Sequence, residues 1–581
     1  MYDLLIRDGL VIDGTGASRR RADVGIVDGR IAEIGRLDGA SAQRTIDAEG
    51  HVVAPGFIDP HTHYDPQITL DPFASSSCFH GVTSVIGGNC GFALAPTRPE
   101  ARDGVKSIFS RVEEIDLAIL DRIPWDFETF PEYLAARAGR LGVNAGFYLG
   151  HCNVRLFAMG TDAYEREATA SELEAMRGIV REAMDAGAMG LASSHSPTDL
   201  DLEDRPVPSR RSALSELRTL CEEVGQAHRG SIAYLPFSAV GGLQPDDGEL
   251  LIELALASRL PVIIQGLGAR SKTDAPTATW PKSKAYLEHA RSLGAAVYSL
   301  LISRPFQRPF SLAAGTTLFE GALAFARLFR EASTVAERRA MLEDPAYRDT
   351  IRRSVEHPNT DPDAGSTTPP PRWDQIRVHR VRGAEHEPLV GRALPEIAEE
   401  RGVAPMDVLV ELSLAEDLET EFLWDTDSPE WRDGTELASR HPQMLIGTSD
   451  AGAHLGRDDG AEFSSYFLRY WVREWERWTL EEAVRALSAI PASVLGLQNR
   501  GLLLPDYAAD LVVFDPQTVG PDHKEIREDR IPGQRRWTSR PKGIAATIVN
   551  GVPIVEGGEI TDAERLPGQV LRPGRALAAR P

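Results

Sequence analysis

Eight short apolar segments, several of them separated by helical stretches, are the feature that most limits how this chain can fold. The stretches at 170–187, 212–230 and 246–258 carry apolar residues at i, i+3, i+4 and i+7, the pattern of a helix with one buried face. Eight strands with intervening helices predict a (β/α)8 TIM-type barrel, an α/β fold. The predicted strands are GFIDPHTH (56–63), GVTSVIGGN (81–89), GVNAGFYLGH (142–151), AMGLASSH (188–195), GSIAYLPFS (230–238), LPVIIQGLG (260–268), AAVYSLLIS (295–303) and QMLIGTSD (443–450).

The two ends of the chain have a different pattern, in which short apolar segments alternate with polar residues. The first fifty residues hold segments broken by Asp-Gly and Glu-Gly pairs, and Asn550-Gly551 separates two apolar runs near the C-terminus. Such pairs between apolar runs are typical of β-hairpins. Because both ends share this pattern, we predict one composite β-sandwich made from both of them.

Residues 304–440 interrupt the barrel pattern with helical pieces and a Pro- and Thr-rich stretch, HPNTDPDAGSTTPPPRW. A connection this long before the last strand is typical of an inserted lid or subdomain rather than of barrel wall. We therefore expect a helical insertion there. The predicted domains are a composite β-sandwich at 1–54 and 490–581, a metal-dependent hydrolase barrel at 55–303 and 441–489, and the insertion at 304–440.

Composition narrows the class of protein. The formal net charge of −23 repels phosphate backbones and anionic lipid surfaces, so neither nucleic acid nor a membrane is an expected partner. Four cysteines in 581 residues do not make a disulfide framework, and MYDLLIRDGL lacks the features of a signal peptide. No run approaches the roughly 18 apolar residues of a membrane span. We expect a soluble cytoplasmic protein, and its oligomeric state, including a homo-oligomer, stays open.

His61 and His63, separated by one residue at the end of the first predicted strand, are the first candidates for chemistry. The period of two in a strand puts both side chains on one face, which in a barrel can look inward at the carboxyl ends of the strands. Taken alone, so short a pattern more often marks two solvated or hydrogen-bonded loop histidines.

Asp450, at the end of the last predicted strand, favours the metal interpretation. A carboxylate at this place can meet the histidine pair across the barrel mouth. Two neutral imidazoles and a carboxylate suit Zn²⁺ or a similar ion, and the carboxylate can also take a proton from the metal's water. The two motifs together predict a metal site more strongly than either does alone.

Several longer segments resemble the amidohydrolase superfamily, specifically its N-acyl-D-amino-acid deacylase (D-aminoacylase) branch. They are PGFIDPHTHYD, GVTSVIGGNCGF, GTSDAGAH, NRGLLLPDYAADLVVFDP and ATIVNG. The resemblance runs from about residue 2 to about residue 575 and is weakest in the insertion. It implies a metal-dependent barrel hydrolase with the metal between the His pair and Asp450. It also implies that Cys90, in the Gly-Asn-Cys-Gly turn, is a ligand, although a Cys with apolar neighbours is often a small core residue.

The chain departs from the family pattern at the ligands of the tighter metal site. The family usually supplies one histidine at the end of the fifth strand and one at the end of the sixth, whereas AYLPFS (233–238) and IIQGLG (263–268) contain none. LASSH, at the end of the fourth strand, has no lysine or glutamate to bridge two metals. We therefore expect one or two ions, most simply Zn²⁺, with fewer or unusual ligands.

Four further residues are candidates for the site. His151, His195 and His454 lie near strand ends and are possible substitutes for the absent ligands or substrate contacts. Arg155 is placed to clamp a substrate carboxylate through its planar guanidinium. For each of the four a structural role is the alternative: a buried or loop histidine, a surface ion pair for Arg155, or part of the turn after Asp450.

The expected function is metal-assisted hydrolysis of a C–N amide bond in a small molecule, with Asp450 as general base and then general acid. The resemblance makes deacylation of N-acyl-D-amino acids the leading substrate class. The alternatives are a cyclic amide or imide hydrolase of the dihydroorotase or hydantoinase kind, and a non-catalytic subunit that only binds a ligand.

Overall fold

The eight predicted barrel strands are all present as parallel strands in this computed structural model, which describes residues 1–239, 243–265, 267, 276–361, 364–456 and 460–574. They form two parallel sheets, with strand orders β6-β7-β8 and β17-β13-β12-β11-β10-β9. Tyr148 divides the third predicted strand into β8 and β9, and a parallel bridge between Thr62 and Ala451 links the ends of the first and last strands. The strands are β6 (Phe57–Asp59), β7 (Val82–Gly87), β8 (Asn144–Phe147), β9 (Leu149–Gly150), β10 (Gly190–Ser194), β11 (Ser231–Leu235), β12 (Val262–Gln265), β13 (Val297–Leu301) and β17 (Met444–Ile446).

The wall of the barrel is buried on both faces, which is why its strands have continuous apolar runs. One set of strand residues, including Ile58, Ile86, Ile263, Leu300 and Leu445, packs together as one buried cluster. Alternate residues such as Val262 and Ile264 pack in the larger cluster that includes the surrounding helices. Residues two apart on a strand therefore share a face, and this rule decides which strand-end side chains enter the mouth.

The three predicted barrel helices are confirmed. They are α5 (Ala170–Ala186), α6 (Leu214–Gln226) and α7 (Pro245–Ser258). Helix α5 begins with a capping box between Thr169 and Glu172 and ends at Gly187 in a left-handed conformation. The other helices outside the insertion are α1 (Arg102–Val112), α2 (Leu117–Leu120), α3 (Phe130–Arg137), α4 (His151–Met159), α8 (Pro276–Ser292), α15 (Phe463–Tyr466), α16 (Leu480–Leu487) and α17 (Ala489–Val494).

Strands from the two chain ends pair in one nine-stranded sheet, as predicted. The join is the antiparallel pairing of β5 with β18. Asp28 and Gly29 have φ of 51° and 71°, and Asn550 and Gly551 have φ of 46° and 78°, so both pairs form the hairpin turns that need two left-handed residues. The strands are β1 (Tyr2–Val11), β2 (Arg20–Val27), β3 (Arg30–Gly35), β4 (Ala42–Asp47), β5 (Val52–Pro55), β18 (Leu511–Phe514), β23 (Ile544–Val549), β24 (Val552–Glu556) and β25 (Glu559–Ile560).

The insertion was predicted to be helical, and this was incomplete, because it also contains a three-stranded antiparallel sheet in the order β14-β16-β15. Its apolar side chains form a cluster separate from the barrel core, and the cluster includes Phe319, Phe325 and Leu409. The sheet was missed because its strands are short and come from distant parts of the segment. The elements are β14 (Gln307–Phe310), α9 (Leu323–Glu331), α10 (Val335–Glu343), α11 (Pro345–Glu356), β15 (Ile376–Arg380), α12 (Leu394–Arg401), α13 (Pro405–Ala415), β16 (Glu421–Asp425) and α14 (Pro429–Ser439).

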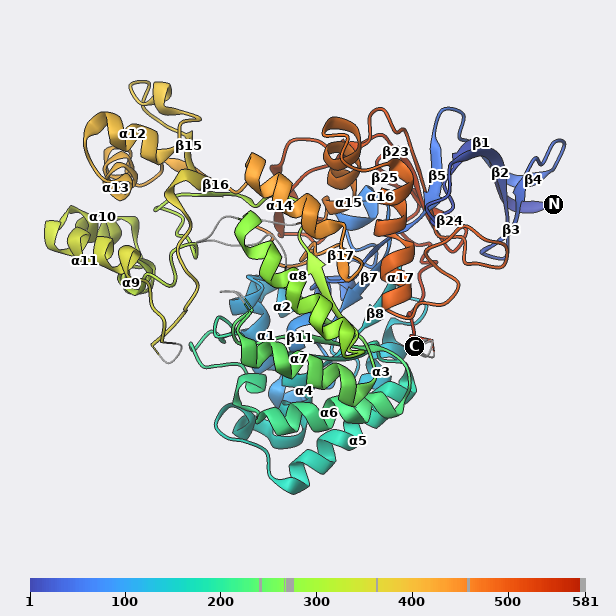
Figure 1. Ribbon diagram of the computed structural model, residues 1–581, viewed down its shortest axis with the longest axis horizontal. Helices are drawn as coiled ribbons and strands as arrows, with labels where there is room; N and C mark the ends of the chain where they lie inside the picture. The colour runs from blue at the N-terminus through green and yellow to red at the C-terminus, as the bar shows by residue number, and fades with distance from the viewer. Residues whose placement is uncertain (240–242, 266, 268–275, 362–363, 457–459, 575–581) are drawn as a thin grey trace.

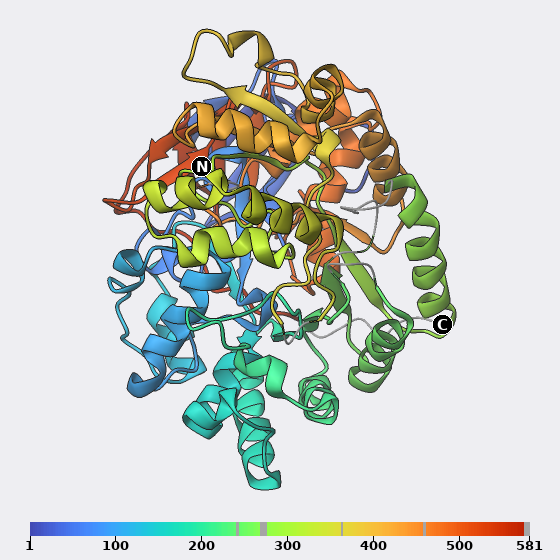
Figure 2. The ribbon, with the colours of Figure 1, turned by 90° about the vertical axis from the view of Figure 1, so that its left-hand side faces the viewer.

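The three parts follow one another along the longest axis of the molecule. Figure 1 shows strands β1–β4 at one end, the barrel with its helices in the centre and helices α9–α13 at the other end. Figure 2 views the molecule from the insertion side, with the yellow-green helices in front. In the described part of the chain, no helix has both the length and the apolar character needed to cross a membrane.

Candidate metal centre

His61 and His63 follow the first barrel strand and are held between β7 and the segment that follows β17. The backbone N–H of Thr62 donates to the carbonyl of Ile86 at 3.0 Å, and that of His63 donates to the carbonyl of Ala451 at 2.8 Å. Both imidazoles are buried, with 3% and 2% of their residues' surface exposed. The histidines are therefore anchored at the mouth of the barrel and are not solvated loop residues.

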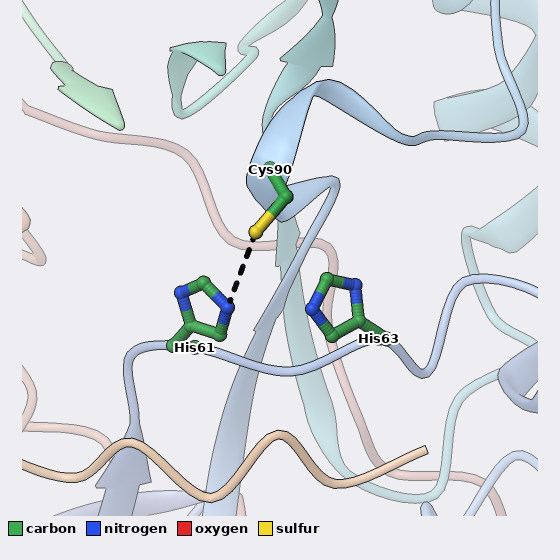
Figure 3. Close-up of side chains that lie close together, drawn as sticks. All are labelled: His61, His63 and Cys90. Atoms are coloured by element: carbon green, nitrogen blue, oxygen red, sulfur yellow. Dashed lines mark hydrogen bonds between the residues drawn. The ribbon is translucent and has the colours of Figure 1, made fainter. Parts of the chain in front are cut away.

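Cys90 reaches the same place from a tight turn after β7. Gly88 has φ of 74°, and a Cβ there would lie 2.3 Å from the carbonyl oxygen of Tyr148, so only glycine fits. The turn is tied to the histidine segment, because the Gly88 N–H donates to the buried carboxylate of Asp65 at 2.9 Å. Figure 3 shows the Cys90 sulfur directed toward the two imidazole rings, and its Sγ lies 3.8 Å from Nε2 of His61.

The donor atoms of His61, His63 and Cys90 all lie within 4.8 Å of one another. Asp450 faces this triplet, with Oδ1 at 3.3 Å from Nε2 of His61 and 3.9 Å from Nε2 of His63. Two imidazoles, a sulfur and a carboxylate oxygen are a donor set that suits Zn²⁺. Within the described residues, this triplet is the group of His, Cys, Asp and Glu side chains close enough to hold an ion.

Two of these residues adopt backbone conformations that are uncommon for side chains with a Cβ. Cys90 has φ of 55° and Asp450 has φ of 55°, both in the left-handed region. Such conformations persist only where the surrounding structure imposes them, and they concentrate at functional sites. The turn after β7 and the segment after β17 are thus shaped to present these two side chains.

Burial and neighbouring charges set the protonation of the site. Burial lowers the pKa of His63 to about 3, so its imidazole is neutral and has a lone pair to donate. Burial raises the pKa of Asp450, but its hydrogen bond with His61 and the charges of the nearby histidines outweigh this and hold the pKa well below its usual range. Burial raises the pKa of the Cys90 thiol well above its usual value, and a bound cation would displace its proton.

A cavity of about 220 Å³ opens over the donor group. His454 lines it, with Nδ1 at 3.4 Å from Oε2 of Glu114. Glu113 also lines it, and its Oε1 lies 3.4 Å from Nδ1 of His63, the ring nitrogen away from Asp450. A carboxylate in that position can orient a ligating histidine. Burial raises the pKa of Glu113 well above its usual value.

The sequence motifs did not point to Glu113 or to Gln265. Gln265 is the last residue of β12, and its amide nitrogen lies 2.5 Å from Nε2 of His61. Its position at a strand end was a usable signal, because that is where barrel sites form. Glu113 follows helix α1, in a connecting segment rather than at the end of a strand. No periodic pattern in the sequence indicates that its side chain faces the barrel mouth.

His151 and Arg155 were predicted as tentative substrate contacts, but the structure does not bring them to the cavity. Both are fully buried. Nε2 of His151 lies 2.8 Å from Oε1 of Glu216, and Nη1 of Arg155 donates to both carboxylate oxygens of Glu216 at 2.7 and 2.6 Å. Nδ1 of His151 lies 2.8 Å from the Ser193 hydroxyl. The geometry is that of a buried ion pair, whereas the alternative considered for Arg155 was an ion pair on the surface.

This buried pair predicts a loss of stability. Glu216→Ala would leave the Arg155 guanidinium buried without its counter-charge, which costs about 3–5 kcal/mol. We expect denaturant titration to show this loss as a lower unfolding midpoint. The control is Glu222→Ala on the same helix, which removes an exposed pair with Arg218 and should shift the midpoint little. Equal midpoints for the two variants would contradict the structural role of Glu216.

His195 lies apart from the donor group, in the wall of a different cavity. Its Nδ1 is 2.7 Å from the Tyr234 hydroxyl and its Nε2 is 3.0 Å from the Ser212 hydroxyl. Burial lowers its pKa to about 4. Of these four candidate residues, His454 is therefore the one that lines the same cavity as His63, Cys90 and Asp450.

The fold and this donor group define an α/β-barrel protein with a candidate metal centre at the barrel mouth. The sequence profile of the amidohydrolase family matches residues 44–555, and the chain belongs to this family. It falls within the D-aminoacylase and N-acyl-D-glutamate deacylase branch.

Three comparisons illustrate this placement. The chain is 30% identical to an uncharacterized protein of Mycobacterium tuberculosis, over 100% of this chain and 96% of that one. It is 29% identical to D-aminoacylase of Alcaligenes xylosoxydans xylosoxydans, over 95% and 94%. A crystal structure of N-acyl-D-glutamate deacylase from Bordetella bronchiseptica, complexed with zinc and a phosphonate inhibitor, superposes with a TM-score of 0.64 at 26% identity, over 98% of this chain and 99% of that one.

Proposed function

We propose that this protein is a zinc-dependent hydrolase of linear amides that deacylates N-acyl-D-amino acids. The observation that carries the proposal is the buried triplet of His61, His63 and Cys90, which faces the carboxylate of Asp450 at the mouth of the barrel. Membership of the amidohydrolase family supports C–N bond hydrolysis. Similarity over nearly the whole chain to D-aminoacylase supports the substrate class.

His61, His63 and Cys90 would hold the ion, and Asp450 stands beside it. A bound divalent ion supplies a water of lowered pKa and polarises the carbonyl of the scissile amide. Asp450, ionised because its pKa lies below the usual range, accepts the proton of the attacking water at a carboxylate oxygen. The same carboxyl then gives this proton to the leaving nitrogen, which departs as an amine. Glu113, whose Oε1 lies 3.4 Å from Nδ1 of His63, would accept a hydrogen bond from that nitrogen when the other ring nitrogen binds the ion.

A second, larger cavity gives room for the substrate. It has a volume of about 380 Å³ and lies between the ends of β12 and β13 and the insertion. Gln265, Phe306 and Trp424 line both cavities and so mark where the two meet. The rings of Phe306 and Trp424 stack with centroids 5.3 Å apart at 10°. An acylated amino acid of ordinary size fits such a pocket, with its scissile amide at the junction.

A substrate panel tests the proposal. Zinc-loaded protein is expected to release free amino acid from N-acyl-D-amino acids at a rate at least ~10-fold above that for the L-enantiomers and for cyclic imides, a selectivity of about 1.4 kcal/mol. Preference for dihydroorotate or hydantoins would favour the cyclic-amide alternative. Zinc binding without turnover of any amide in the panel would favour the non-catalytic binding subunit.

We also propose that the site holds a single ion. The support is that the described residues supply one compact donor group and that the ends of β11 and β12 bring no histidine to it. Elemental analysis of protein purified with excess zinc and then passed over a desalting column is expected to give one zinc per chain. Two tightly held ions per chain would refute this stoichiometry.

A further inference from the structure

Gln265 is in direct contact with the donor group, although it belongs to none of the motifs that predict the site. Its Nε2 lies 3.1 Å from Nδ1 and 2.5 Å from Nε2 of His61. Nε2 of His61 is the same nitrogen that faces Asp450 at 3.3 Å and Cys90 at 3.8 Å. The amide group of Gln265 therefore sits beside the atom that an ion would bind.

The fold places Gln265 there by the period of the strand. Ile263 packs with Leu300 and Leu445 in the buried cluster formed by one face of the wall, while Val262 and Ile264 pack in the other cluster. Gln265 is two residues beyond Ile263, so its side chain leaves the strand on the face of Ile263. It is also the last residue of β12, which puts it at the mouth rather than in the packed interior.

The chemistry of the amide decides how it meets a cation. The oxygen and nitrogen ends of a glutamine side chain have nearly the same shape, and their assignment follows from the surroundings. With a divalent cation at the lone pair of His61, an N–H donor would be repelled and a carbonyl oxygen attracted. The side chain then turns its Oε1 to the cation, and a rotation about the last side-chain torsion suffices.

Charge favours a neutral oxygen at this position. With an ion bound, the thiolate of Cys90 and the carboxylate of Asp450 would together carry two negative charges, which balance a divalent ion, and imidazole ligands would add none. Another anionic ligand would leave a net negative charge in a buried site, which is costly. An amide oxygen would add a fourth donor to those of His61, His63 and Cys90 without adding charge, and it would leave the fifth position that zinc can take open for a water.

We propose that Gln265 is a ligand of the divalent ion held by His61, His63 and Cys90, through its Oε1. This rests on the metal centre of the proposed function and adds a ligand to it. Gln265 also lines both cavities, so it stands between the ion and the space for the substrate.

The test is metal affinity, which does not depend on turnover. We expect Gln265→Ala to weaken zinc binding about 10-fold in competition with a chromophoric chelator, about 1.4 kcal/mol. We also expect a changed visible absorption band in the cobalt-substituted protein, because the ligand field loses an oxygen donor. Gln265→Glu keeps an oxygen donor and should bind zinc at least as tightly as Gln265→Ala does.

Gln375→Ala is the matched control. Gln375 also lines the larger cavity, but its Oε1 accepts a hydrogen bond from the indole N–H of Trp424 rather than contacting His61. It should leave zinc affinity and the cobalt spectrum unchanged. Gln265→Ala with parental affinity and parental spectrum would overturn the inference, as would a parent protein that binds no zinc. If the Gln265 effects are found but no amide is hydrolysed, this inference stands and the hydrolase proposal fails.

Discussion

Asp450→Asn is expected to lower kcat for an N-acyl-D-amino acid by about 10³-fold, within the range for loss of a general base and acid. Asparagine has nearly the same shape as aspartate but cannot accept a proton at neutral pH. The carboxylate of Asp450 is the group that faces both histidines, with its Oδ1 at 3.3 and 3.9 Å from their nitrogens. The measurement is steady-state turnover at saturating zinc, so that any loss of metal affinity does not enter kcat.

Asp199→Asn is the control for this result. Asp199 is a buried acid that lines the same cavity, but its oxygens accept hydrogen bonds from the Ser194 hydroxyl at 2.5 Å and the Thr198 hydroxyl at 3.2 Å. Because both carboxylate oxygens of Asp199 already accept hydrogen bonds, we expect the substitution to lower kcat less than about 10-fold. This is a smaller loss than removal of a general acid or base causes. Asp450→Asn with more than a tenth of parental kcat would remove Asp450 from the role of base.

Cys90→Ala is expected to weaken zinc binding by at least about 100-fold, or about 2.7 kcal/mol. The sulfur lies 3.8 Å from Nε2 of His61 and belongs to the compact donor group, and a thiolate is the strongest zinc donor there. Turnover should fall in parallel when zinc is limiting and recover in part when zinc is raised. The measurements are chelator competition and a zinc titration of activity.

Cys221→Ala separates loss of the ligand from general loss of a buried thiol. Cys221 is also buried, but it lies on α6 among apolar side chains and outside the donor group. The substitution removes one sulfur from the core, so it should lower the melting temperature while leaving zinc affinity at the parental value. If both cysteine variants bind zinc as tightly as the parent protein, Cys90 is a core residue, and the ligand role that the family resemblance implies for it is wrong.

The barrel could be predicted from the sequence because each of its elements has a strong local pattern. Continuous apolar runs such as LPVIIQ mark strands buried on both faces, and the period of α5 marks a helix with one buried face. The Asp28-Gly29 and Asn550-Gly551 turns were predictable because few residue pairs adopt two left-handed conformations in succession. The sheet of the insertion was not, because Gln307 pairs with Asp425 far along the chain and both strands are short.

Only the residues of the candidate site that belong to recognisable sequence motifs could be predicted from the sequence. His61, His63, Cys90 and Asp450 all stand in segments that resemble one family, and the structure brings them together. Arg155 had the right residue type for a carboxylate clamp, but its partner is Glu216, which lies two helices further along the chain, on α6. A local pattern cannot tell a guanidinium that faces a cavity from one that a distant carboxylate has neutralised in the core.

The sequence by itself therefore determined the barrel strands, the three barrel helices, the two hairpin turns, and which four residues are the main candidates for the site. These follow from local rules, namely the period of a strand or helix and the φ values that each residue type tolerates. Only the tertiary structure placed Gln265 and Glu113 beside the donor group and placed His151, Arg155 and His195 away from it. The physical reason is that these placements depend on the order of strands around the barrel and on burial, which create contacts between residues far apart in the chain.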